Sequence, residues 1–219
     1  MVYSAIHLVH AVKVKPRKVL FRSPIPGHSQ PAEYHGSRTL EGDELTDKKL
    51  TWPRTIWIIG PPCVGKTTLA RLLVDHIRAD NCPAMLLDGD DIRKIYDTNL
   101  GYDPASRRKQ TVRVQKLAQW VISQDVLPVV AINHPFEEDR AICRDALPGY
   151  FEISLDCELK ERIRRDNKKL YLPALRGEKR HVVGVDIPFE EPKTADLVLN
   201  SEELSPEELL NTIIKNLSR

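Results

Sequence analysis

The chain has 219 residues and a formal net charge of +2, from 33 lysines and arginines against 31 aspartates and glutamates. Its hydrophobic content of 41% is ordinary for a folded protein, and no run approaches the roughly 18 consecutive apolar residues of a membrane-spanning helix. The near-neutral charge gives no indication of a nucleic-acid binder. The four cysteines are widely spaced without a C-x-x-C pair, which favours a reduced cytoplasmic protein over a disulfide or zinc scaffold.

The first 53 residues differ from the remainder. Residues 1–32 hold five basic and no acidic side chains, and residues 22–53 are rich in proline, glycine and serine. We therefore expect 1–53 to be a largely irregular N-terminal extension with at most one short strand. An organelle-targeting segment and a start codon placed too far upstream are the alternatives. Residues 54–219 have the length of one ordinary domain, since domains average about 150 residues.

From residue 54 onward, short apolar runs alternate with amphipathic segments. The expected strands are Thr55–Gly60, Ala84–Leu87, Leu127–Ile132, Tyr150–Leu155 and Ala195–Asn200. The expected helices are Lys66–Ala79, Ser106–Gln124, Phe136–Ala146, Glu158–Asn167 and a last helix capped by Ser205. This alternation predicts an α/β fold whose parallel sheet is covered by helices on both faces.

Residues 60–67 read GPPCVGKT and match the phosphate-binding pattern G-x-x-x-x-G-K-[ST]. The pattern lies between an expected strand and an expected helix, where backbone N–H groups and the positive helix N-terminus can face phosphate oxygens. Lys66 would reach the β- and γ-phosphates of ATP, and the Thr67 hydroxyl would ligate Mg²⁺. The expected ATP-binding residues are Gly60, Pro61, Pro62, Cys63, Val64, Gly65, Lys66, Thr67 and Thr68.

A cluster of aspartates follows the second expected strand, at Asp88, Asp90 and Asp91. This position is at the carboxyl edge of the sheet, beside the phosphate loop. Phosphoryl transfer needs an acid that orients or deprotonates the attacking hydroxyl, and an acid that holds hydrated Mg²⁺. We assign Asp90 to the first role and Asp88 to the second, although the two could be exchanged. Without an N-K-x-D guanine motif, the chain fits a small-molecule kinase better than a GTPase.

Six stretches between residues 56 and 200 share their order and spacing with one family. They are IWIIGPPCVGKTTLA (56–70), LLDGDDIR (86–93), LGYDPASRR (100–108), RRDNKKLYLPALRGE (164–178), VVGVDIPFEEP (182–192) and ADLVLN (195–200). In these stretches the chain resembles the adenylylsulfate (APS) kinases. Enzymes of this family transfer the γ-phosphate of ATP to the 3′-hydroxyl of adenosine 5′-phosphosulfate, giving PAPS in sulfate activation.

The resemblance implies a P-loop NTPase fold with five parallel strands and a mobile lid over about residues 164–188. It also implies that Lys168 faces the phosphates and the acceptor, and that Arg165 lies near the ATP base. The lid is strongly basic, which suits closure over a polyphosphate. Together with Lys168, Arg93 and Arg107 are the expected anchors of the acceptor.

The departures from the family pattern cluster on the acceptor side. Where APS kinases carry an asparagine and two arginines in the long helix, this chain has Gln110, Val112 and Arg113. The family's Ile-Ser-Pro-Tyr-Arg is replaced by Asn-His-Pro-Phe-Glu at 133–137, where the glutamate would repel an anion, and the lid aromatic is Val182. His134 is as compatible with packing as with acceptor contact. The expected acceptor contacts from these positions are Gln110, Arg113, Asn133, His134 and Val182.

Several alternatives remain open at this point. Residues 182–192 resemble family members linked to surface-polysaccharide modification, including cytidine diphosphoramidate kinases, so the acceptor could be another nucleotide-like compound. A catalytically silent nucleotide-binding protein and a polynucleotide kinase are further alternatives. We expect ATP and Mg²⁺ as cofactors and a small-molecule nucleotide as partner, rather than a nucleic acid or a membrane. A homodimer is compatible with the sequence.

Overall fold

The computed structural model describes residues 52–96 and 100–217. Five strands form one sheet in the order β2-β3-β1-β4-β5, and all neighbouring strands are parallel. The strands are β1 (Thr55–Ile59), β2 (Ala84–Asp88), β3 (Leu127–Ala131), β4 (Tyr150–Asp156) and β5 (Leu197–Asn200). The predicted five-stranded parallel α/β fold is confirmed. The expected N-terminal extension lies outside the described residues, apart from Trp52 and Pro53.

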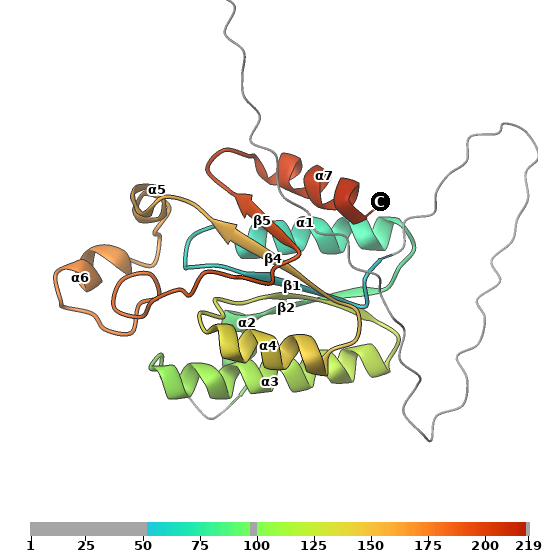
Figure 1. The fold of residues 1–219 in the computed structure, drawn as a ribbon, viewed down its shortest axis with the longest axis horizontal. Coiled ribbons are helices and arrows are strands. Elements are labelled where there is room, and N and C mark those ends of the chain that lie inside the picture. Colours follow the sequence, from blue (N-terminus) through green and yellow to red (C-terminus); the bar gives the residue numbers. More distant parts are fainter. Residues whose placement is uncertain (1–51, 97–99, 218–219) are drawn as a thin grey trace, which may run out of the picture.

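Helices cover both faces of the sheet (Figure 1). Helices α1 (Lys66–Ala79) and α7 (Pro206–Leu217) lie on one face, and α3 (Pro104–Ser123) and α4 (Glu137–Ala146) lie on the other. In the central strand β1, Ile56 and Ile58 belong to the core on the α1–α7 side, whereas Trp57 and Ile59 belong to the core on the α3–α4 side. A strand buried on both faces has to be apolar at successive positions, which explains the sequence TIWII.

Local capping decides where several helices begin. The expected last helix starts as predicted, because Ser205 and Glu208 form a reciprocal capping box in which each backbone N–H meets the other's side chain. Helix α3 starts at Pro104 rather than at the expected Ser106, because the Asp103 carboxylate accepts the backbone N–H of Ser106 at 2.9 Å. Helix α2 (Gly89–Ile95) was not expected, and Asp88 caps it.

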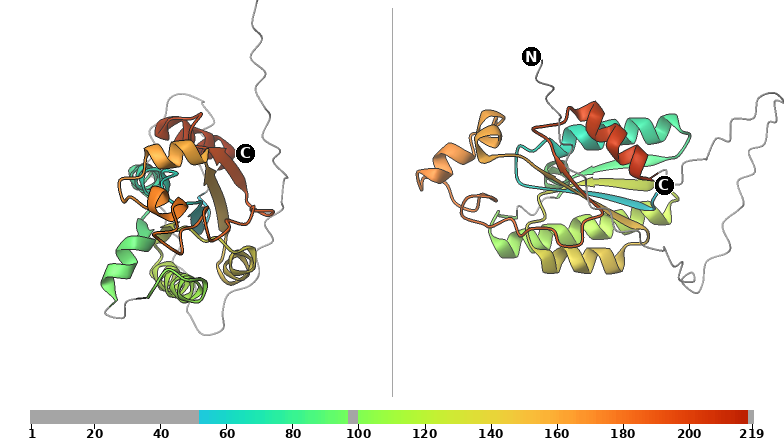
Figure 2. Two further views of the ribbon diagram at one scale, coloured as in Figure 1. Left: turned by 90° about the vertical axis from the view of Figure 1, so that its left-hand side faces the viewer. Right: turned by 45° about the horizontal axis from the view of Figure 1, so that its top comes forward.

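The predicted lid, residues 164–188, lies beyond the carboxyl ends of the strands (Figures 1 and 2). It is preceded by α5 (Leu159–Arg164), which ends before the expected Asn167, and it contains α6 (Tyr171–Leu175). Within the lid Tyr171, Ala174 and Val182 form a small apolar core. The Tyr171 hydroxyl donates to the Pro62 carbonyl at 2.9 Å, so the lid rests on the phosphate loop. Mobility of the lid stays a prediction.

None of the described helices combines the length and the apolar character needed to cross a membrane.

Gly60 joins β1 to the phosphate loop at a close backbone approach. Its φ is +147°, and a Cβ added there would lie 2.2 Å from the Leu155 carbonyl oxygen of β4. We expect Gly60→Ala to lower the free energy of unfolding by about 3 kcal/mol or more, since the clash adds to backbone strain. Gly177→Ala is the control, because Gly177 has a φ of +77° but no atom within 4 Å of the added Cβ. Equal losses in urea denaturation would contradict the steric explanation.

Candidate active site

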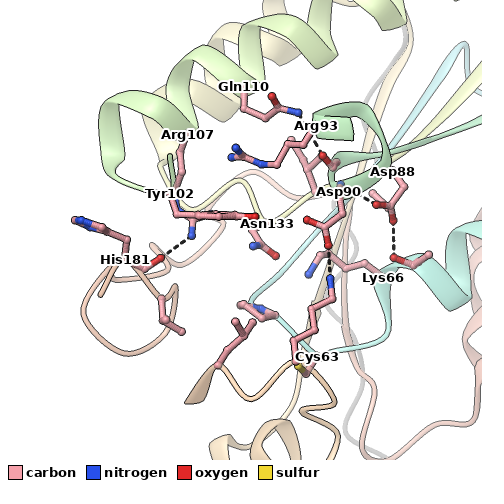
Figure 3. A pocket seen from close by; sticks show the side chains of 18 of the residues that line it. Cys63, Lys66, Asp88, Asp90, Arg93, Tyr102, Arg107, Gln110, Asn133 and His181 are labelled. Atoms are coloured by element: carbon pink, nitrogen blue, oxygen red, sulfur yellow. Dashed lines mark hydrogen bonds and ion pairs between the residues drawn. The ribbon is translucent and has the colours of Figure 1, made fainter. Parts of the chain in front are cut away.

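A cavity of about 520 Å³ lies between the carboxyl edge of the sheet and the lid. Figure 3 shows that Lys66 and Asp88 lie toward one end and that Arg107 and His181 lie toward the other, with Asp90 between them. The phosphate loop, the start of α2, the loop before α3, the end of β3 and the lid all contribute to its lining. Segments far apart in the chain therefore meet here because parallel strands end at one edge.

The phosphate loop divides into lining and supporting residues. The lining residues are Pro62, Cys63, Gly65, Lys66, Thr67 and Thr68. By contrast, Val64 is fully buried in the core, and the Gly60 N–H donates to the Asn133 carbonyl at 3.4 Å. Prolines carry no N–H, so Pro61 and Pro62 cannot hold a phosphate through an amide donor. The loop residues that line the cavity and carry a backbone N–H are 63, 65, 66, 67 and 68. Contact of the predicted residues with ATP stays a prediction.

Lys66 is held in the loop by its own neighbours. Its Nζ donates to the carbonyl oxygens of Gly60 at 2.9 Å and Pro61 at 2.6 Å. Burial lowers the pKa of Lys66 to about 8. The ammonium group has no carboxylate partner among the described residues, so a polyphosphate anion in the cavity would stabilise its charge.

Asp88 connects the phosphate loop with the acidic segment. Its Oδ2 accepts the Thr67 hydroxyl at 2.6 Å, while its Oδ1 accepts the Asp90 backbone N–H at 2.8 Å. No group of three or more His, Cys, Asp or Glu that could hold a metal occurs among the described residues. Mg²⁺ in kinases is commonly held by one or two protein oxygens together with substrate phosphates. The adjacent Thr67 and Asp88 oxygens therefore fit Mg²⁺ that arrives with ATP.

Asp90 and Lys168 meet across the cavity. The Lys168 Nζ donates to the Asp90 Oδ2 at 2.5 Å, which brings the lid to the acidic segment. This hydrogen bond raises the pKa of Lys168, so the lysine stays protonated. Both side chains are more than half exposed, at 65% for Lys168 and 53% for Asp90, so a ligand can reach them. Sequence analysis predicted that both residues are in the site, and the structure brings them together.

An aromatic ring flanked by two arginines forms the other end of the cavity. The Tyr102 ring lies 4.6 Å from the Arg93 guanidinium carbon and 5.7 Å from that of Arg107. Arg107 Nη2 donates to the His181 carbonyl at 2.7 Å, and burial lowers the pKa of Arg107 to about 10. Sequence analysis missed Tyr102 as a site residue. The stretch LGYDPASRR, already matched to the family, was the signal that could have identified it.

Four further predicted residues also line the cavity: Gln110, Asn133, Arg165 and Val182. Gln110 Nε2 donates to the Gly89 carbonyl at 3.3 Å, whereas its buried Oε1 has no hydrogen-bond partner among the described residues. Arg165 donates to Glu161 and to Ser201, which fixes its guanidinium beside the loop after β5. Val182 is only 4% exposed, because most of its surface packs in the lid core.

The structure does not bring His134 or Arg113 into the cavity lining. The His134 side chain is 2% exposed, and its Nδ1 accepts the Trp57 indole N–H at 3.0 Å, so the histidine has a packing role. The Arg113 guanidinium lies over the Tyr96 ring, at 4.5 Å. The acceptor contacts predicted for both residues therefore have no support in this geometry. The sequence pattern could not show which side of the strand end or of α3 faces inward.

The expected repulsion by Glu137 is also corrected. Its carboxylate forms an ion pair with Arg140 at 2.5 Å. Arg140 is 1% exposed and also donates to the carbonyl oxygens of His134 and Glu190. The charge of Glu137 is therefore neutralised by a buried arginine three positions further along α4.

Burial of His134 predicts a pH effect on stability. Burial, together with the Arg140 charge, lowers the pKa of His134 to about 3, below its ordinary value of about 6.5. Above pH 6.5 the His134 imidazole is neutral in both the folded and the unfolded state. As the pH falls from 6.5 toward 3, the unfolded state gains a proton that the folded state resists. This difference lowers the free energy of unfolding by up to about 1.4 kcal/mol per pH unit.

Urea denaturation between pH 7 and pH 4.5 measures this slope in the wild-type protein and in His134→Gln. We expect the glutamine variant to be less stable at pH 7 but to lose less stability on acidification. His181→Gln, which removes an exposed imidazole, is the control. If the free energy of unfolding of His134→Gln changed with pH as steeply as that of the wild type, the buried histidine would not be the cause of the effect.

Comparison with known proteins agrees with this geometry. The family model described as adenylylsulphate kinase matches residues 52–200. A probable adenylyl-sulfate kinase of Pyrococcus abyssi is 34% identical over 161 residues, covering 74% of this chain and 92% of the relative. A cytidine diphosphoramidate kinase of Campylobacter jejuni is 35% identical over 167 residues, covering 76% of this chain and 97% of the relative.

Among solved structures, the fold is similar to the Mycobacterium tuberculosis APS kinase CysC in complex with AMPPNP and APS. The TM-score is 0.70 with 32% sequence identity, and the match covers 75% of this chain and 97% of the other. The match to the family model covers more than half of the chain. This chain therefore belongs to the adenylylsulfate kinase family and is a phosphotransferase that acts on a hydroxyl group.

Proposed function

We propose that this protein uses ATP to phosphorylate the 3′-hydroxyl of adenosine 5′-phosphosulfate, giving PAPS. One observation supports the proposal most strongly: a single cavity joins the phosphate loop to the Tyr102 ring and its two arginines, with Asp90 and Lys168 between them. A phosphate donor at one end and a nucleotide acceptor at the other would then meet at Asp90.

ATP would bind at the phosphate-loop end. Residues 63 and 65–68 line the cavity at this end, and their amides, together with the Lys66 ammonium, would bind the phosphates. Arg165 lines the cavity on the side of the loop after β5, where it could cover the ATP base. Thr67 and Asp88 would hold Mg²⁺, which neutralises charge on the β- and γ-phosphates when bound.

The acceptor would bind at the other end. Tyr102 offers an aromatic face for a nucleoside base, while Arg93 and Arg107 offer charge to its anionic 5′ group. Asp90 would accept the proton of the attacking hydroxyl, whose oxygen then bonds to the γ-phosphorus as the bond to the ADP oxygen breaks. Lys168, already beside Asp90, would stabilise the negative charge on the transferring group.

A cytidine diphosphoramidate acceptor is the second candidate, and the residue at lid position 182 is one observation that favours it. Val182 packs against Tyr171 within the lid, so this position offers no aromatic ring to complete a stack opposite Tyr102. The buried Gln110 Oε1 is free to accept a hydrogen bond from an exocyclic amino group, which both adenine and cytosine carry. The 35% identical relative named for this activity adds to the case.

Turnover with a panel of acceptors tests the assignment. ADP release from Mg²⁺-ATP would be followed with adenosine 5′-phosphosulfate and with cytidine diphosphoramidate, each over a range of concentrations. The proposal expects the higher kcat/KM with the adenylyl compound. A higher kcat/KM with the cytidylyl compound would assign the second function instead. No turnover with either would overturn both, while the family and fold would remain.

Replacement of Asp90 tests the catalytic role. Asp90→Asn keeps the shape of the side chain but removes its capacity to take up a proton, so kcat should fall by about 10²- to 10⁴-fold. ATP affinity, measured by calorimetry, should change by less than about threefold. Asp91→Asn is the matched control, because Asp91 is exposed and pairs with Lys94 at 2.8 Å. Unchanged kcat in Asp90→Asn would remove Asp90 from the mechanism.

A further inference from the structure

Two lid cations that line the cavity, Lys179 and Arg180, lack the acidic partner that most other lid cations have among the described residues. Lys169 lacks one as well, but it does not line the cavity. Arg164 and Arg165 pair with Glu161, Lys168 pairs with Asp90, and Arg176 pairs with Glu178. Within residues 52–96 and 100–217, Lys179 and Arg180 make neither an ion pair nor a side-chain hydrogen bond. Both are exposed, yet both line the cavity. Both side chains therefore border a space that can hold a ligand.

These two cations are next to the acceptor end of the cavity. The backbone that carries them is fixed there, because the following residue, His181, accepts the hydrogen bond of Arg107 through its carbonyl. Asp186 holds the same segment by accepting the backbone N–H groups of His181 at 2.6 Å and Val182 at 2.7 Å. Figure 3 shows His181 beside Arg107 and Tyr102, away from Lys66.

The acceptor end carries an excess of positive charge. Arg93 and Arg107 donate only to backbone carbonyl oxygens among the described residues, and the Arg93 charge is one of the factors that lower the pKa of Arg107. The nearby Asp186 carboxylate already accepts two backbone donors, and Asp103 accepts two hydrogen bonds from Ser106. With Lys179 and Arg180 added, four cations line the same cavity, and anionic groups of a ligand bound there would relieve their repulsion.

From this arrangement we infer that Lys179 and Arg180 bind the distal anionic group of the acceptor, the group joined to its 5′-phosphorus through an anhydride or similar bond. Arg93 and Arg107 then hold the 5′-phosphate itself. The inference rests on the proposed function, since it takes the acceptor to be a nucleotide at Tyr102. It names the two side chains that would let the site prefer such an extended acceptor over the corresponding simple 5′-monophosphate.

Calorimetry with extended and truncated ligands tests the inference. The full chain, with Mg²⁺ and saturating AMPPNP, would be titrated with adenosine 5′-phosphosulfate and AMP, and with cytidine diphosphoramidate and CMP. The quantity of interest is the ratio of the Kd of the monophosphate to that of its extended partner. In the double variant K179Q/R180Q this ratio should fall by about tenfold, because charge-assisted contacts to the distal group are lost.

The matched control is the double variant K160Q/R176Q. It removes two exposed cations from the region of α5 and α6 that do not line the cavity, so its ratio should remain within about twofold of the wild-type value. An unchanged ratio in K179Q/R180Q would overturn the inference, as would equal weakening of both ligands, the same loss in the control, or no binding of any ligand to the wild type.

Turnover separates this inference from the proposed function. If the wild type phosphorylates an acceptor but the ratio is insensitive to K179Q/R180Q, the inference fails and the function remains. If the ratio falls as expected but the wild type phosphorylates neither acceptor, the proposed function fails and the binding role of the lid cations remains.

Discussion

The carboxylate of Asp88 connects the phosphate loop to the acidic segment at the start of α2 and fixes their relative position. One oxygen accepts the Thr67 hydroxyl at the start of α1, and the other accepts the Asp90 backbone N–H at the start of α2. Because β2 and β1 are parallel members of one sheet, their carboxyl ends place these helix starts at the same edge. The position of Asp90 relative to the phosphate loop thus depends on a side chain fixed at both oxygens.

The main features of the fold follow from local sequence patterns, namely apolar runs and short motifs. The doubly buried β1 is an uninterrupted apolar run, and the phosphate loop is a local motif between a strand and a helix, so both could be predicted. Contacts between segments that are far apart in the sequence could not be predicted in this way. The burial of His134 depends on Trp57, 77 positions away, and the neutralisation of Glu137 depends on the inward-facing Arg140. Side-chain direction at a strand end or on a helix is decided by packing, which a single sequence does not display.

Charge in the site is arranged by segment rather than by the chain as a whole. The formal net charge of +2 carries no information about the ligand. Locally, the carboxylates of Asp88 and Asp90 lie beside the phosphate loop, whereas the acceptor end has arginines that donate to backbone oxygens. Such a division suits a reaction in which a proton and a metal are handled at the centre and anionic groups are bound at both ends.

The proposed function requires the γ-phosphate to move to an acceptor hydroxyl rather than to water. Phosphorus-31 NMR of a reaction containing Mg²⁺-ATP and adenosine 5′-phosphosulfate tests this most directly, since it identifies the product itself. We expect ADP together with a new phosphomonoester resonance coupled to the 3′ proton of the acceptor ribose. Formation of ADP and inorganic phosphate without that resonance would contradict it.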